Sequence, residues 1–129
     1  MVGLPDQTAE TLADDILMLK GLDLDMISVG PFIPHPDTPL GEADPGTLEM
    51  TLKVVALTRL VTQNAHIPAT TAMGSIDPLG REKALQCGAN ILMPNLTPAR
   101  YRAHDQIYPN KVCLFESDER CAPCATRVV

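Results

Sequence analysis

Residues 30–40 read GPFIPHPDTPL and directly follow an apolar run, residues 26–29, that predicts a buried strand. Prolines at positions 31, 34, 36 and 39 lack a backbone N–H and disfavour helix in the residue before them. We therefore expect the chain to leave a strand as a stiff, extended segment, here called the proline loop. Ligands bind where parallel strands end, so this loop is a candidate cofactor wall. A connection that only covers the strand ends is the alternative.

Around the proline loop, predicted helices alternate with predicted strands. Helices are predicted at residues 8–20, 45–63, 81–86 and 99–106, and strands at 24–29, 65–73 and 90–93. Thr8 is expected to cap the first helix and Gly21 to end it, and Asp44 with Pro45 to start the second. Asp77 and Pro78 are the start signal for the third helix.

This alternation predicts the α/β class, with helices crossing between parallel strands. The chain begins where a strand is already ending, at residues 1–4, and about four strands would leave open sheet edges and exposed helix faces. We therefore expect the second half of a βα barrel cut from a longer protein.

The composition excludes several classes of function. The 129 residues form one domain or less, and two Phe, two Tyr and no Trp require a core of aliphatic residues and Met. A net charge of −6 without a basic cluster argues against nucleic acid and anionic membranes as partners. No signal peptide and no apolar run of about 20 residues is present, so a soluble, cytoplasmic protein is expected.

Three of the four cysteines have a metal-binding spacing. Cys113, Cys121 and Cys124 read C-x7-C-x2-C, which suits an iron–sulfur cluster with an external fourth ligand, or zinc completed by His104 or an acid. Three unrelated reduced thiols are the alternative. Cys87, at a predicted helix end, is expected to be a small buried residue.

Seven stretches in order carry a resemblance to a known family. They are MVGLPDQT (1–8), GPFIPHPDTPL (30–40), LTRL (57–60), IPATTAMGS (67–75), GRE (80–82), CGANILMPN (87–95) and VCLFESDERCAPC (112–124). Together they resemble the radical S-adenosylmethionine maturases of FeFe-hydrogenase, in the biotin synthase-like group. GLPDQT alone is common to many such radical enzymes, whereas the ordered set is specific.

The resemblance implies the C-terminal part of a (β/α)8 TIM-type radical SAM barrel for residues 1–111. Residues 112–129 would be a cysteine-bearing tail with an accessory iron–sulfur site. Such enzymes bind S-adenosylmethionine at a 4Fe–4S cluster held by C-x3-C-x2-C, a triplet this sequence lacks. The resemblance thus implies that the full-length protein is an enzyme. Without that triplet, the 129-residue fragment alone would be inactive.

The resemblance also implies roles for residues at the expected strand ends. Those near the cofactor would be Gly3, Leu4, Pro5, Pro31, Phe32 and Ile33, with the last three close to the adenine. Those facing the substrate cavity would be Met26, Thr70, Thr71 and Met93, none of which supplies an acid, base or nucleophile. No catalytic residue is assigned.

Each of these roles has a structural alternative. Phe32, Ile33 and the two methionines could be ordinary core residues. Thr70 and Thr71 are adjacent, so both can face a ligand only if the strand has already ended there. His35 in the proline loop either reaches the site or lies at the surface. No role is assigned to Tyr101 or Tyr108.

Three functions remain open at this point. The first is a maturase that uses a 5′-deoxyadenosyl radical on an iron- or sulfur-containing small-molecule precursor of the di-iron centre, together with other hydrogenase maturation proteins. The second is a related radical enzyme of biotin or methylornithine synthesis. The third is a non-enzymatic metal-binding module that uses the C-terminal cysteines.

Overall fold

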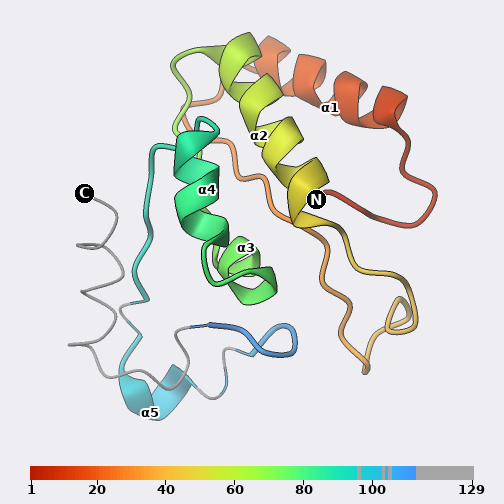
Figure 1. The fold of residues 1–129 in the computed structure, drawn as a ribbon, viewed down its shortest axis with the longest axis vertical. Helices are drawn as coiled ribbons and strands as arrows, with labels where there is room; N and C mark the ends of the chain where they lie inside the picture. Colours follow the sequence, from red (N-terminus) through yellow and green to blue (C-terminus); the bar gives the residue numbers. More distant parts are fainter. Residues whose placement is uncertain (96, 103, 105, 113–129) are drawn as a thin grey trace.

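The computed structural model describes residues 1–95, 97–102, 104 and 106–112. Within these residues the helices are α1 (Ala9–Gly21), α2 (Leu48–Thr62), α3 (Thr71–Ile76), α4 (Gly80–Gln86) and α5 (Ala99–Arg102). Figure 1 shows α1, α2 and α4 in a row, in the order of the chain, with the extended segment that follows α4 running beside that helix. No helix in the described part of the chain is long and apolar enough to cross a bilayer.

The extended segments form a layer held by parallel bridges. The bridges join Val2 to Pro31, Met26 to His66, and Pro68 to Ile91. Each segment therefore pairs with the next one along the chain, and a helical connection separates each pair. The bridges follow the order of the βα arrangement that the sequence predicts, but no strand longer than a single bridge forms among the described residues.

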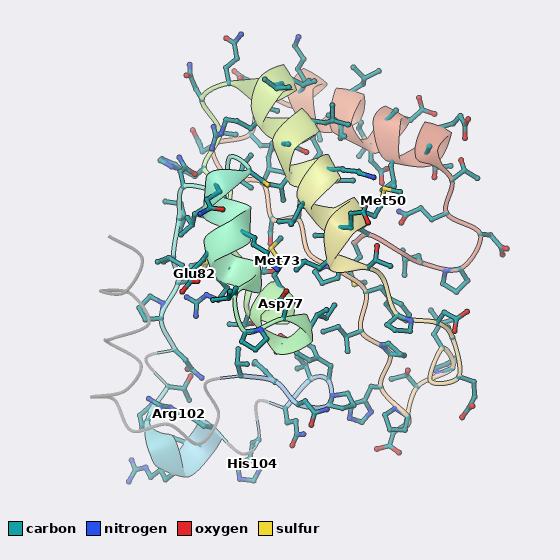
Figure 2. The ribbon with its side chains drawn as sticks, in the orientation of Figure 1. Met50, Met73, Asp77, Glu82, Arg102 and His104 are labelled. Carbon is teal, nitrogen blue, oxygen red and sulfur yellow. The ribbon has the colours of Figure 1, made fainter. Side chains whose placement is uncertain are left out.

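The two faces of this extended layer differ in burial. On the helix side, alternate residues such as Ile27, Val29 and Ile67 are buried in one core with α1, α2 and α4. On the opposite side, Met26 is 49% exposed and Met93 is 57% exposed. The fully buried Met73, labelled in Figure 2, belongs to the helix-side core. Among the described residues, the core helices thus cover one face of the layer, and Met26 and Met93 on the other face are exposed.

The helix boundaries confirm one predicted cap and correct another. Thr8 caps α1 in a capping box with Thr11. The second helix begins at Leu48 rather than Pro45, because Thr47, not Asp44, is its N-cap and accepts from the Met50 N–H. In α1, Gly21 is the last helical residue and the C-cap follows it.

The predicted strands at 24–29, 65–73 and 90–93 contain only isolated bridges among the described residues. Proline explains part of this difference, since Pro31 and Pro68 lie at bridges and have no N–H to extend a ladder. Residues 71–73 are helical rather than extended, because α3 begins at Thr71.

Within the described residues, α5 covers Ala99–Arg102 of the predicted helix 99–106, and residues 103 and 105 lie outside the described part. α5 ends at Arg102, whose side chain is fully buried. Its Nε donates to the carbonyl of Thr97 at 2.6 Å and its Nη2 to that of Asn95 at 3.2 Å. A buried arginine thus fixes the turn that follows the last extended segment.

Candidate functional site

The proline loop forms one wall of a cavity of about 370 Å³ at the ends of the extended segments. Pro31 and Phe32 are buried in this wall and Ile33 is half-buried. Phe32 is 7% exposed and lies outside the main core cluster. We call this space the proline-loop cavity. Its further lining includes Met1, Ser28, Gly30, His35, Thr70 and Tyr108.

A second cavity, of about 260 Å³, lies beside the first and shares Thr70 with it. Thr71 and Met93 also line this threonine cavity, together with Asn95 and Lys111. Thr71 Oγ1 lies 3.0 Å from Tyr108 Oη, so the two hydroxyls are hydrogen-bonded. Because α3 begins at Thr71, the extended segment has ended by this point, and both threonines reach a cavity wall.

Thr70 is the residue that the two cavities have in common. It is the N-cap of α3, yet its side chain makes no capping hydrogen bond. Its Oγ1 is buried and has no hydrogen-bond partner among the residues that the structure describes. A Cβ added at Gly30 would come 3.1 Å from this oxygen, so only glycine leaves that space clear. An unsatisfied buried hydroxyl is unfavourable unless a ligand or water completes it.

Gly3, Leu4 and Pro5 line neither cavity. Gly3 has a φ of +89°, and a Cβ there would overlap the Cα of Gly46. Its N–H donates to Gln7 Oε1 at 2.7 Å. The need for glycine at position 3 is therefore explained by backbone packing.

Met26 also lies outside both cavities, but on their side of the extended layer. Its neighbour two residues on, Ser28, lines the proline-loop cavity. Met26 and Met93 are too exposed in this structure to be core residues. The structure thus gathers the residues from 31 to 33 with Thr70, Thr71 and Met93, and leaves the residues from 3 to 5 and Met26 apart.

Sequence reasoning assigned no function to Tyr108 or Ser28. Tyr108 is buried, and it comes from the segment after α5 to line the proline-loop cavity. Only the fold shows this, because a tyrosine between Ile107 and Pro109 belongs to no helical or strand periodicity. Ser28 could have been identified from alternation along the predicted strand 24–29.

The predicted metal ligands Cys113, Cys121 and Cys124 lie outside the described residues. Within the described residues, no group of three or more His, Cys, Asp and Glu side chains could hold a metal ion. Cys87 is a half-buried free thiol at the C-cap of α4, rather than the buried residue expected.

Comparison with known proteins tests the resemblance seen in the motifs. No family model matches the chain. Along its whole length, however, the chain is similar to an [FeFe] hydrogenase maturase, which confirms the resemblance seen in the motifs.

That relative is the [FeFe] hydrogenase maturase subunit HydE of Thermotoga maritima, with 56% identity over 129 residues. The match covers all of this chain and 37% of the relative, so the chain spans little more than a third of the relative's length.

Proposed function

We propose that this chain forms the C-terminal part of a radical SAM barrel in an [FeFe] hydrogenase maturase. The identity to HydE supports the maturase rather than an enzyme of biotin or methylornithine synthesis. Within the described residues, the barrel is supported by sequential parallel pairing, by core helices on one face, and by the exposed Met26 and Met93 on the opposite face. In a closed barrel, that open face would be the interior.

The main observation that indicates a ligand site is the buried hydroxyl of Thr70, which lies between the two cavities and has no partner among the described residues. In our proposal the proline-loop cavity holds the nucleoside of S-adenosylmethionine. Pro31, Phe32 and Ile33 give it an apolar wall, and Gly30 leaves room beside Thr70. These residues fit such a group, because an apolar surface with few polar groups is typical of cofactor pockets. When bound, the cofactor supplies 5′-deoxyadenosyl radical chemistry.

The threonine cavity would hold the small-molecule precursor of the di-iron centre. Thr71 is oriented by Tyr108, and Met93 supplies a polarisable apolar wall. Neither is an acid, a base or a nucleophile, so these residues position the substrate and exclude water. The iron- or sulfur-containing nature of this substrate and the other maturation proteins as partners are part of the proposal.

The 4Fe–4S cluster needs ligands from outside this sequence, since C-x3-C-x2-C is absent from it. We therefore expect the 129 residues alone not to cleave the cofactor. The spacing of Cys113, Cys121 and Cys124 favours an accessory iron–sulfur site. As a test of that site, Cys121→Ala should lower the iron retained after anaerobic reconstitution.

The function is tested with a chimera in which this chain replaces the matching 37% of the T. maritima maturase. We expect the reconstituted chimera to bind S-adenosylmethionine, to cleave it reductively and to activate an [FeFe] hydrogenase. Met93→Glu should abolish activation, because it replaces an apolar wall of the proposed substrate cavity with a charged one. Asp14→Asn, an exposed change on α1, is the control. A folded, cluster-loaded chimera that binds no S-adenosylmethionine would contradict the proposal.

A further inference from the structure

His35 lines the proline-loop cavity from within the proline loop, and one edge of its ring is already engaged. Its Nδ1 accepts a hydrogen bond from the backbone N–H of Asp37 at 3.2 Å. The Asp37 carboxylate lies on the same edge, 3.8 Å from Nδ1. The side chain of His35 is 29% exposed, whereas that of Asp37 is 90% exposed. The loop therefore holds the ring by its Nδ1 edge.

The backbone around His35 is braced by the loop itself. The carbonyl of His35 accepts from the Thr38 N–H at 3.0 Å and from Thr38 Oγ1 at 2.7 Å. The Gly41 N–H donates to the Thr38 carbonyl at 2.9 Å. A Cβ at Gly41 would come 2.9 Å from the His35 carbonyl oxygen, so glycine allows this close turn. These bonds fix the backbone that carries the ring.

The bond to Nδ1 also decides which nitrogen of the neutral ring carries the proton. A nitrogen that accepts a hydrogen bond has no proton, so the proton is on Nε2. Within the described residues, Nε2 has no hydrogen-bond partner. His35 is thus a residue of the cavity wall whose ring carries an N–H donor, and Thr70, with its unpartnered hydroxyl, lines the same cavity.

We propose that His35 is a specificity-determining residue whose Nε2–H donates to an acceptor atom of the bound nucleoside. This inference rests on the proposed function, because it assumes a nucleoside in the proline-loop cavity. It predicts that the nucleoside itself, without the amino acid part of the cofactor, is sufficient to engage His35.

Two substitutions separate the two edges of the ring. His35→Asn retains an acceptor near the position of Nδ1 and removes the donor at Nε2. His35→Gln places an amide N–H near the position of Nε2 and removes the acceptor at Nδ1. Asp37→Asn is the control, since the bond to Nδ1 comes from the backbone of residue 37. The chimera would be titrated calorimetrically with S-adenosylhomocysteine and, separately, with 5′-deoxyadenosine.

For both probes, we expect His35→Asn to raise Kd about three- to tenfold and His35→Gln to change it by less than about threefold. Asp37→Asn should match the unmodified chimera. Weaker binding in His35→Gln with unchanged binding in His35→Asn would show that the ring only braces the loop. Equal loss in both variants, no loss in either, or a loss confined to S-adenosylhomocysteine would also overturn the inference. If the unmodified chimera binds neither probe, the proposed function itself fails.

Discussion

The hydroxyls of Thr71 and Tyr108 lie 3.0 Å apart and join two parts of the chain that are 37 residues apart in sequence. A second bond, from the Val112 N–H to Ser75 Oγ at 3.1 Å, joins the same two segments. The segment after α5 is therefore fixed to α3 at two points. Because Tyr108 and Val112 line different cavities, this attachment completes the walls of both.

Tyr108→Phe should remove the first attachment without leaving a void. We expect it to lower the free energy of unfolding by about 1 kcal/mol, because Thr71 Oγ1 loses its partner in a partly buried place. Urea unfolding of Tyr108→Phe, Thr71→Val and the double variant gives a double-mutant cycle. The expected coupling is about 0.5–1.5 kcal/mol, and strictly additive effects would mean that the hydroxyls do not interact.

Thr70→Val should change stability and ligand binding in opposite directions. The hydroxyl of Thr70 is buried without a partner, so an apolar group of similar shape should raise the free energy of unfolding by up to about 1 kcal/mol in the absence of ligand. In the chimera, the same change should weaken binding of S-adenosylhomocysteine, because a ligand-facing hydroxyl is lost.

Thr58→Val is the matched control for Thr70→Val. Thr58 is also buried, but its Oγ1 donates to the Val54 carbonyl of its own helix at 2.7 Å. Its replacement should therefore bring no gain in stability and leave ligand binding unchanged. If Thr70→Val destabilises the protein and spares binding, the hydroxyl has a structural partner and is not a ligand group.

Much of this fold follows from local signals in the sequence. Thr8 predicts the start of α1, and the apolar stripe with Leu12 and Ile16 predicts its buried face, because capping and periodicity are properties of adjacent residues. The predicted start of α2, at Pro45, was wrong by three residues. Asp44-Pro45 and Thr47 are competing start signals, and only Thr47 caps the helix. Local patterns cannot decide between such neighbours.

The site is less accessible to sequence reasoning, because it depends on contacts between distant segments. The family resemblance identified Thr70 and Thr71 as site residues. It did not predict that Thr70 Oγ1 lacks a partner or that Tyr108 reaches Thr71. Similarly, a glycine at position 3 suggests a close approach, while only the fold identifies Gly46 as the neighbour. Sequence indicates which residue types are unusual, and packing decides what they contact.

Gly3→Ala and Gly21→Ala should have opposite effects on stability. At position 3, φ is +89° and a Cβ would overlap Gly46, so we expect a loss of at least about 2 kcal/mol. At the end of α1, a Cβ on Gly21 meets nothing within 4 Å, and alanine should stabilise by about 0.5–1 kcal/mol. Thermal unfolding of the two variants checks this, and equal melting temperatures would contradict the backbone geometry at Gly3.

The loop between α3 and α4 should make stability depend on pH in the acid range. The hydrogen bond from Lys83 Nζ, at 2.6 Å, and then the one from the Leu79 N–H lower the pKa of Asp77 below its ordinary value of about 3.9. Asp77, labelled in Figure 2, therefore binds a proton more readily in the unfolded chain than in the folded one. Its contribution to stability is present above the ordinary pKa and is lost as the pH falls through the lowered pKa of the folded state.

Asp77→Asn separates this charge effect from the turn that Asp77 makes, because the amide oxygen of asparagine can still accept from the Leu79 N–H. We expect the variant to lose stability near neutral pH and to show a flatter stability profile between about pH 5 and 2, measured by urea unfolding at each pH. Asp44→Asn is the control, since Asp44 is exposed and has no ion pair within the described residues. Salt of about 1 M should shrink the difference between Asp77→Asn and the unmodified chain, because the pair with Lys83 is partly exposed and therefore screened. An unchanged acid profile in Asp77→Asn would mean that the ion pair contributes nothing to folding.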